Sequence, residues 1–490
     1  MRPWLVSPFL LTIACNAHEA DYSMTGDYSM SEDYSSAPDD SSEAAETNPW
    51  TDTSEDTVST FSVDVDSASY SMARRSINEG ELPEASSVRV EEFINYFRYD
   101  DPRPDGELPF AVSLEAAPSA FGHDEDVHLM RIGIQAEEIP EEDRDPVNLI
   151  FLLDVSGSMN SPDKLGLVVY AMKHLVDKLT SSDTLGIVVY AGSEGVVLDP
   201  TAVEDKSAIL DALDALQAGG GTNGAAGIQL AYELAERAFR PEGVNRVVLC
   251  TDGDFNVGLT GESLIEMVED YRDRDIFLTT LGFGTGNYND ELMEQLADRG
   301  NGNYAYIDSP NEALRVLGDK LVSTLQVVAK DVKVQVEFDA STVERWRLIG
   351  YENRILDDED FADDNVDAGD IGAGHTVSAL YELELTDTPE AADLAEVRIR
   401  YKEPTSDESS EHIWSIHGDE RESDFAAASD SFRFSAAVTE FAEILRESPY
   451  SEGARFGEVA EILSESAPES ERDLSQDELI ELVDAASALY

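Results

Sequence analysis

Positively charged residues are scarce in this chain. Its 490 residues include 33 lysines and arginines against 103 aspartates and glutamates, which gives a formal net charge of -70. A protein that binds nucleic acid needs a basic surface to meet the phosphates, and no basic stripe stands out here. We therefore expect no nucleic-acid partner, and an acidic, well-solvated surface.

Cysteine is almost absent as well, because the chain has only two. Cys250 lies inside an apolar segment, where a thiol packs as a small core side chain. Cys15 follows Arg2 and a largely apolar stretch, a pattern that resembles a short secretory signal ending in a lipobox. We expect Cys15 to be the lipidated first residue of the mature protein, and we expect no disulfide.

The apolar run before Cys15 is too short to span a bilayer as a stable helix. Lysine and arginine are missing altogether from residues 16–73, where an Asp-Tyr-Ser-Met motif recurs. This composition predicts a disordered acidic tether between the membrane anchor and the folded part. Asn16 is not the aspartate associated with inner-membrane retention, so we expect an exported protein anchored in the outer rather than the inner membrane.

The most informative segment is an apolar run that ends in Asp154-Val155-Ser156-Gly157-Ser158-Met159. The run is followed by a helical pattern, which predicts a buried parallel strand whose carboxyl end opens into a loop. Ligands bind at that end in doubly wound α/β sheets. A tight loop can turn Asp154, Ser156 and Ser158 toward one point, and their hard oxygens would select Mg²⁺, Mn²⁺ or Ca²⁺.

Two later segments can complete such a site. Thr222 lies in a glycine-rich turn before a helix, where it can present its hydroxyl. Asp252 follows a second apolar strand, which puts its carboxylate at the same edge of the sheet as Asp154. The alternative interpretation is that the aspartates only cap helices and the serines form a turn. The threonine and the second aspartate, found in chain order, favour the metal site.

Asp154, Ser156, Ser158, Thr222 and Asp252 together resemble the metal-ion-dependent adhesion site of von Willebrand factor type A domains. The resemblance implies that the three hydroxyls bind the metal directly, while the two aspartates bind through water or hold the waters in place. Neutral ligands would leave the ion, Mg²⁺ before Mn²⁺ or Ca²⁺, ready to accept a carboxylate from a partner protein. That mechanism breaks no bond, so we predict no catalytic residue and no enzyme.

The apolar patterns divide the chain into five segments. These are a signal with lipobox (1–15), the tether (16–57), an N-terminal region (58–146), an α/β domain (147–325) and a C-terminal region of strands and helices (326–490). Alternating strands and helices in 147–325 predict a doubly wound parallel sheet with the metal at its topological switch point. Strands flank this domain, so we expect residues 110–140 and 330–405 to form one β-sandwich into which it is inserted.

The flanking regions resemble bacterial von Willebrand factor type A lipoproteins of the YfbK-like kind. The resemblance rests on residues 64–70 and 90–97 before the α/β domain, and on residues 351–354 and 367–376 after it. It covers nearly everything after the tether. It implies the whole architecture, with the C-terminal region packing against the N-terminal one.

Two loops beside the predicted metal carry aromatic residues. Phe255 follows Asp252 closely, and Phe283 and Tyr288 lie in a later glycine-rich segment. Aromatic side chains are common at protein interfaces, so these three are candidates for a rim that contacts the partner.

Two other functions stay open besides a lipid-anchored binder. One is a Mg²⁺-dependent hydrolase of phosphoesters or peptides using the same metal. We count the absence of a nearby base or lysine against it. The other is a structural envelope scaffold whose metal only braces the loop.

Overall fold

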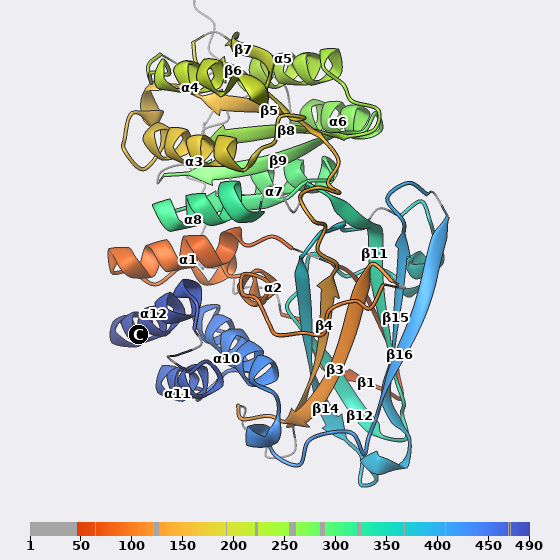
Figure 1. Ribbon diagram of the computed structural model, residues 1–490. Coiled ribbons are helices and arrows are strands. Elements are labelled where there is room, and N and C mark those ends of the chain that lie inside the picture. Colours follow the sequence, from red (N-terminus) through yellow and green to blue (C-terminus); the bar gives the residue numbers. More distant parts are fainter. Residues whose placement is uncertain are drawn as a thin grey trace, which may run out of the picture. The chain divides into compact units, whose positions relative to one another are not determined.

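The computed structural model (Figure 1) describes residues 47–63, 65–106, 108–121, 127–192, 194–220, 224–253, 261–284, 290–320, 325–366, 368–406, 408–468, 470 and 472–490. The chain divides into two units, 1–42 and 43–490, and every described residue belongs to the second. The signal, Cys15 and the tether up to residue 46 lie outside the described residues. What the sequence implies for these segments therefore stays a prediction.

The central domain is built on a six-stranded sheet in the order β10-β9-β8-β5-β6-β7. All neighbours pair in parallel except the edge strand β7, which is antiparallel to β6 and was not predicted. The doubly wound α/β fold expected from the sequence is confirmed. Its elements are β5 (Val147–Asp154), α3 (Leu165–Lys178), β6 (Thr184–Tyr190), β7 (Glu194–Ala202), α4 (Lys206–Asp214), α5 (Gly224–Arg237), β8 (Val244–Thr251), α6 (Gly261–Arg272), β9 (Ile276–Phe283), α7 (Asp290–Arg299), β10 (Tyr304–Ile307) and α8 (Pro310–Leu314).

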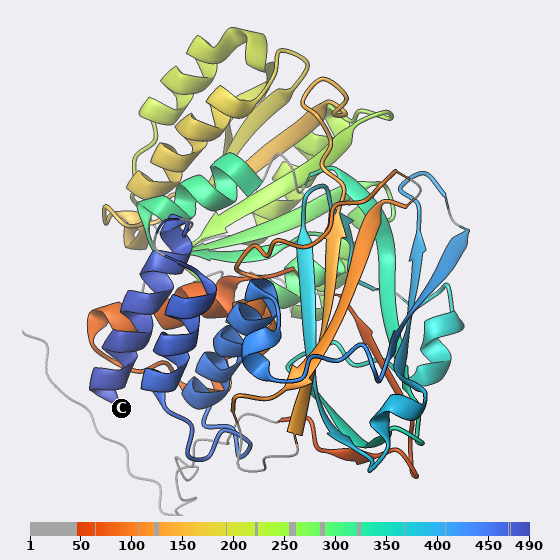
Figure 2. The same ribbon diagram turned by 60° about the horizontal axis from the view of Figure 1, so that its bottom comes forward.

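Strand β5 is buried along its whole length because helices cover both faces of the sheet (Figures 1 and 2). Successive side chains of a strand point to opposite faces. Leu149 and Phe151 accordingly pack in one core with α3, α4 and α8, whereas Ile150 and Leu152 pack in another with α5, α6 and α7. An unbroken apolar run is what such a strand requires.

The flanking strands form two sheets packed face to face, as predicted. Strand β4, which precedes the central domain, pairs with β14, which follows it, so the domain is inserted into a β-sandwich. One sheet has the order β1-β12-β14-β4-β3, and the other has β13-β11-β15-β16 with β2 on β11. The strands are β1 (Thr51–Asp52), β2 (Val58–Ser62), β3 (Phe110–Pro118), β4 (Val127–Ala136), β11 (Val327–Phe338), β12 (Val343–Ile349), β13 (Ile371–Gly372), β14 (Thr376–Leu385), β15 (Asp393–Lys402) and β16 (Ser409–His417).

The outer face of the first sheet is covered by helices from both ends of the described chain. Leu129, Ile349 and Leu380 pack there with buried side chains of those helices. The packing of the C-terminal region, with its helices, against the N-terminal region was expected, but α11 was not predicted. The helices are α1 (Ala68–Glu79), α2 (Val90–Ile94), α10 (Asp430–Leu445), α11 (Phe456–Ser466) and α12 (Leu474–Leu489).

Residues 47–57 differ from the expectation of a tether. Thr51 and Asp52 pair with β12, and the Asn48 amide donates to the carbonyl oxygens of Leu348 and Gly350, at 3.1 and 2.7 Å. These backbone and side-chain hydrogen bonds attach the segment to the edge of a sheet. Order thus begins before residue 57. The polar composition of the segment gave no sign of this order in the sequence.

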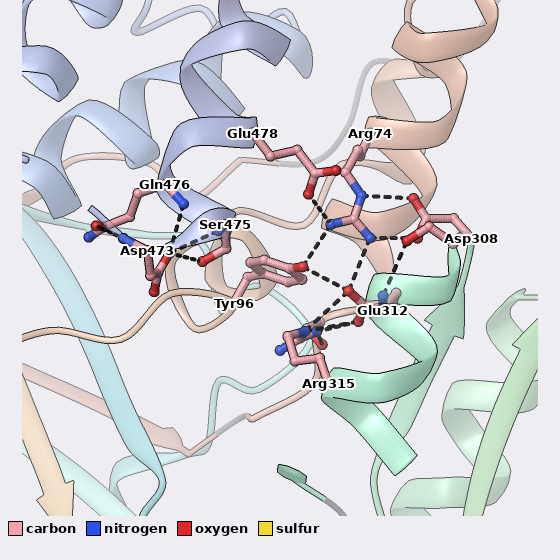
Figure 3. A network of polar contacts seen from close by, with 11 residues as sticks. Arg74, Tyr96, Asp308, Glu312, Arg315, Asp473, Ser475, Gln476 and Glu478 are labelled. Carbon is pink, nitrogen blue, oxygen red and sulfur yellow. Dashed lines mark hydrogen bonds and ion pairs between the residues drawn. The ribbon is translucent and has the colours of Figure 1, made fainter. Parts of the chain in front are cut away.

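A buried polar network joins the central domain to the helices on either side of it in the sequence (Figure 3). The Arg74 guanidinium of α1 donates to Asp308 at 2.7 Å, to Glu312 at 3.0 Å and to Glu478 of α12 at 2.9 Å. Glu312 also accepts from the Tyr96 hydroxyl and pairs with Arg315. These arginines hold the pKa of the buried Glu312 carboxyl at about 2, against the effect of burial.

We predict that Arg74→Met lowers the free energy of unfolding by about 3–5 kcal/mol, because it leaves Asp308 and Glu312 buried with an incomplete set of partners. Chemical denaturation would measure the loss. Arg103→Met is the matched control, since Arg103 and its partner Glu138 are both exposed, and such pairs contribute only about 0–1 kcal/mol. Equal effects of the two substitutions would contradict the prediction.

Glu440 of α10 is a buried acid with an unsatisfied atom. Its side chain is 9% exposed, and Oε1 has no hydrogen-bond partner among the described residues. Burial, followed by repulsion from Glu443 and Glu382, raises the pKa of Glu440 to about 8 despite the nearby Arg347. The folded protein therefore keeps a proton at neutral pH that the unfolded chain releases.

This raised pKa makes stability fall as pH rises. The contribution of Glu440 is complete below its ordinary value of 4.5 and is lost as pH climbs toward about 8, with a slope of up to about 1.4 kcal/mol per pH unit. We predict that Glu440→Gln flattens the curve over this interval, as measured by denaturation from pH 5 to 9. The exposed Glu461→Gln should leave the slope unchanged. An identical slope in wild type and Glu440→Gln would refute the assignment.

Candidate metal-binding site

Asp154 is the last residue of β5, and its side chain is buried at the carboxyl edge of the sheet. The backbone N–H of Ser156 donates to Asp154 Oδ1 at 2.7 Å, and the Thr251 hydroxyl lies 3.5 Å from Oδ2. Burial raises the pKa of Asp154, the hydrogen bonds from Ser156 oppose this, and the charge of Asp252 adds to it. The carboxylate is thus held in a fixed orientation in a site that would be stabilised by a cation.

Ser156 and Ser158 lie on the loop that follows β5. Their hydroxyl oxygens are 2.8 Å apart, and the loop continues into a short 3-10 turn at Gly157–Met159. Ser156 is buried and Ser158 is exposed. Two hydroxyls so close together can offer oxygen lone pairs to one ion at the surface of the site.

The glycine-rich turn lies directly against this loop. The N–H of Gly219 donates to the Val155 carbonyl at 2.7 Å, and the N–H of Gly157 donates to the Gly220 carbonyl at 3.1 Å. Gly220 has a φ of 98°, a conformation that favours glycine. The chain is therefore brought to the candidate site two residues before Thr222. Thr222 itself lies outside the described residues, so its role stays a prediction.

Asp252 lies one residue past β8, on the strand next to β5. Its side chain is almost fully buried, and its Oδ1 has no hydrogen-bond partner among the described residues. Its Oδ2 accepts a hydrogen bond from Lys164 Nζ at 2.9 Å. A buried carboxylate oxygen without a partner is costly, and a bound cation or its water would satisfy it.

Lys164 is a site residue that the sequence analysis missed. It directly precedes α3, and its side chain passes so close to Gly284 that a Cβ there would lie 2.1 Å from Lys164 Cε. The expectation that no lysine lies near the site is therefore wrong, and the hydrolase alternative loses one argument against it. The sequence could have indicated this residue, because Lys164 lies only ten residues after Asp154, in the loop leading to α3.

The donor set fits a hard divalent cation. Two carboxylates and two hydroxyls converge from the ends of β5 and β8, on either side of the switch point. Among the described residues, no group of three or more histidine, cysteine, aspartate or glutamate side chains forms a metal site of the carboxylate, imidazole or thiolate kind. Hydroxyl oxygens would have to supply part of the coordination, as Mg²⁺ accepts.

The predicted aromatic rim is only partly testable. Phe283 is fully buried, because β9 extends to it and pairs it with Ile307 of β10, so its assignment to the rim is wrong. The flanking glycines suggested a loop, but the side chain packs in the core shared with α3 and α8. Phe255 and Tyr288 lie outside the described residues and stay predictions.

The other cysteine behaves as expected. Cys250 on β8 is buried and free, and burial raises the pKa of its thiol well above the usual range. It packs as a small core side chain beside the site without taking part in it.

Within the described part of the chain, no helix has the length and apolarity needed to cross a bilayer.

Comparison with family models agrees with the fold. Residues 148–319 match the model described as von Willebrand factor type A domain, and residues 37–131 match one described as von Willebrand factor. Residues 323–489 match the model described as "Uncharacterized protein YfbK, C-terminal". The central domain is thus a von Willebrand factor type A domain, a class that generally acts in protein–protein interaction.

Similarity to a relative over most of the chain identifies a more specific family. The protein YfbK of Escherichia coli (strain K12) is 38% identical over 470 residues, which cover 90% of this chain and 80% of that protein. The chain belongs to the YfbK family of von Willebrand factor type A domain proteins. Two solved structures are similar, von Willebrand factor type A from Catenulispora acidiphila (16% identity, 80% and 98% of the two chains, TM-score 0.45) and the ArnB paralog VWA2 from Sulfolobus acidocaldarius (17%, 78% and 98%, 0.35).

We predict that Lys164→Met tightens Mg²⁺ binding about tenfold, equivalent to ~1.4 kcal/mol, because it removes a cation that competes for Asp252. Calorimetric titration with Mg²⁺ would measure the change. Lys173→Met is the matched control, since Lys173 lies on α3 and pairs with the exposed Asp214. Unchanged or weaker Mg²⁺ binding by Lys164→Met would show that Lys164 does not compete.

Proposed function

We propose that this chain is a lipid-anchored cell-envelope protein that binds a protein partner through a divalent cation, Mg²⁺ before Mn²⁺ or Ca²⁺. Asp154, Ser156, Ser158, Thr222 and Asp252 hold the ion, and the partner donates a carboxylate to it. The lipid on Cys15 anchors the protein, and the outer membrane is the expected location. The membership of the central domain in a class that acts in protein interaction supports this proposal.

The observation that carries the proposal is the buried Asp252 Oδ1, which has no hydrogen-bond partner among the described residues. An unsatisfied buried carboxylate oxygen costs about 1–3 kcal/mol or more. Asp252 also adds a repulsive charge to the buried Asp154. A divalent cation coordinated at this edge would remove both penalties, whereas the single charge of Lys164 offsets only one carboxylate.

The hydroxyl donors explain why the ion would serve recognition. Ser156 and Ser158 are neutral, so they leave positive charge on the ion that an additional anionic oxygen can neutralise. When bound, the ion supplies Lewis acidity for a partner's carboxylate. The exposure of Ser158 leaves a path for such a ligand to reach the edge of the sheet.

The negative charge of the chain affects the approach of a partner. With a formal net charge of -70, the protein repels an acidic partner at long range. Salt screens this repulsion beyond about 8 Å at physiological ionic strength. Affinity must then come from short-range coordination at the metal and from the surface around it.

We predict that Asp154→Ala abolishes Mg²⁺-dependent retention of a partner from envelope extract, a loss of at least about tenfold, because it removes a carboxylate that organises the ion. The pull-down compares wild type and Asp154→Ala, each with Mg²⁺ and with chelator. Asp211→Ala, at an exposed position of α4, is the matched control and should behave as wild type.

Melting curves for each variant establish that the fold is intact. A partner retained only by wild type and Asp211→Ala, and only with Mg²⁺, supports the proposal. Equal retention in every arm would assign recognition to the sandwich or the helices and leave the metal with a structural role at most. Turnover of phosphoester or peptide substrates that depends on Mg²⁺ and on Asp154 would favour the hydrolase alternative instead.

A further inference from the structure

A cavity of about 310 Å³ lies at the edge of the central sheet opposite the candidate metal site. Its walls come from Arg246 near the start of β8, from the end of α7 and the turn before β10, and from two segments of the sandwich region, near residues 62–66 and 368–375. Arg246, Arg354, Asp66, Asp370 and His375 are among the polar residues that line it. The volume falls at the small end of the usual range for ligand pockets.

Arg246 is a buried cation with incomplete partners. Its side chain is 2% exposed, Nη1 donates to the Thr279 hydroxyl at 2.7 Å, and Nη2 makes a long hydrogen bond of 3.4 Å to the Asn301 carbonyl. Among the described residues, its Nε has no hydrogen-bond partner and its guanidinium forms no ion pair with a carboxylate. A buried charge without a counter-ion is strongly disfavoured.

The other large, fully buried arginines of the described chain are all paired. Arg74 has Asp308 and Glu312, Arg347 has Glu382 and Glu443, and Arg446 has Glu352 and Glu443. Each therefore has its counter-ion within the protein. Arg246 is the exception in this set, and it also lines a cavity.

The acids of the cavity have partners other than Arg246. Arg354 Nη2 lies 3.5 Å from Asp66 Oδ2 and 2.9 Å from Asp298 Oδ1. Asp370 acts on Arg246 only through its longer-range charge, and its Oδ1 accepts the backbone N–H of Asp331 at 3.1 Å. Burial lowers the pKa of Arg246 to about 10, as expected for a cation whose charge is poorly compensated.

We propose that this cavity binds a small anion whose carboxylate or phosphate oxygens accept hydrogen bonds from the Arg246 guanidinium. The fork of donors on arginine suits both oxyanions. The walls are already formed, because Gly369 packs so tightly on the backbone of Val63 that a Cβ would lie 2.2 Å from its carbonyl oxygen. A ligand would enter a rigid site that joins the central domain to the sandwich.

This site is separate from the candidate metal site. Arg246 is near the start of β8 and Asp252 follows its end, six residues later, a span of roughly 20 Å along an extended strand. Anion binding at Arg246 can therefore be tested in the presence of chelator. If no anion binds at Arg246, this result does not argue against metal-dependent partner binding at the other edge of the sheet.

The test measures the melting temperature of the full chain with inorganic phosphate or acetate, in chelator and at constant ionic strength set with chloride. We expect a saturable rise for wild type with at least one anion, and the two arms distinguish phosphate from carboxylate. Arg246→Met should lose this response and melt no lower than wild type in chloride, because it removes an unpaired buried charge.

Two further variants keep the test decisive if Arg246→Met folds poorly. Arg246→Lys should weaken binding about tenfold, since it keeps the charge but loses the donor fork. Asp370→Asn keeps an acceptor for the Asp331 N–H and should tighten binding severalfold, because it removes a repelling charge from the cavity.

Two controls separate the cavity from general charge effects. Arg398→Met removes the same charge from β15, where Arg398 pairs with Glu337, and should leave the anion response intact. Asp252→Ala alters the metal site and should also leave it intact. The proposal is overturned if wild type shows no saturable response to either anion, or if Arg246→Met responds as wild type does.

Discussion

The shared edge of parallel strands is the constraint on which the candidate site depends. Strands β5 and β8 pair in parallel, with Leu153 opposite Cys250, so the residues that follow them emerge side by side. Asp154 and Asp252 are thereby held together, although Thr251, the residue just before Asp252, already lies 97 positions after Asp154 in the sequence. Asp154 could not be moved one position along β5 without its side chain pointing to the other face of the sheet.

The second organising principle is the placement of a small number of cations among many acids. With 33 lysines and arginines in 490 residues, few are available for the interior. Arg74, Arg347 and Arg446 are buried at junctions between elements distant in sequence, where each compensates acids from other segments. Lys164 and Arg246 differ from these, since Lys164 pairs with a candidate metal ligand, whereas Arg246 lines a cavity and has no carboxylate partner among the described residues.

The parts of the structure that could be predicted from sequence are those with local signals. The apolar run at 149–153, its Asp-x-Ser-x-Ser loop and the alternating strands of the sandwich all have short-range periodicities that specify burial. Strand β7 escaped prediction because it lies at the edge of its sheet and is largely exposed, so it lacks an apolar run. Phe283 was misassigned because glycines on both sides are typical of loops, whereas pairing with β10 extends the strand through it.

Contacts that depend on tertiary structure could not be predicted in the same way. The pairing of Lys164 with Asp252 and the isolation of Arg246 arise where segments far apart in sequence meet. The two lie at opposite edges of one sheet, and this has a functional consequence. The carboxyl edge carries the oxygen donors suited to a cation, while the amino edge meets the sandwich and holds a cation suited to an anion. Because β8 contributes to both sites, a ligand at Arg246 would brace the strand that also positions Asp252.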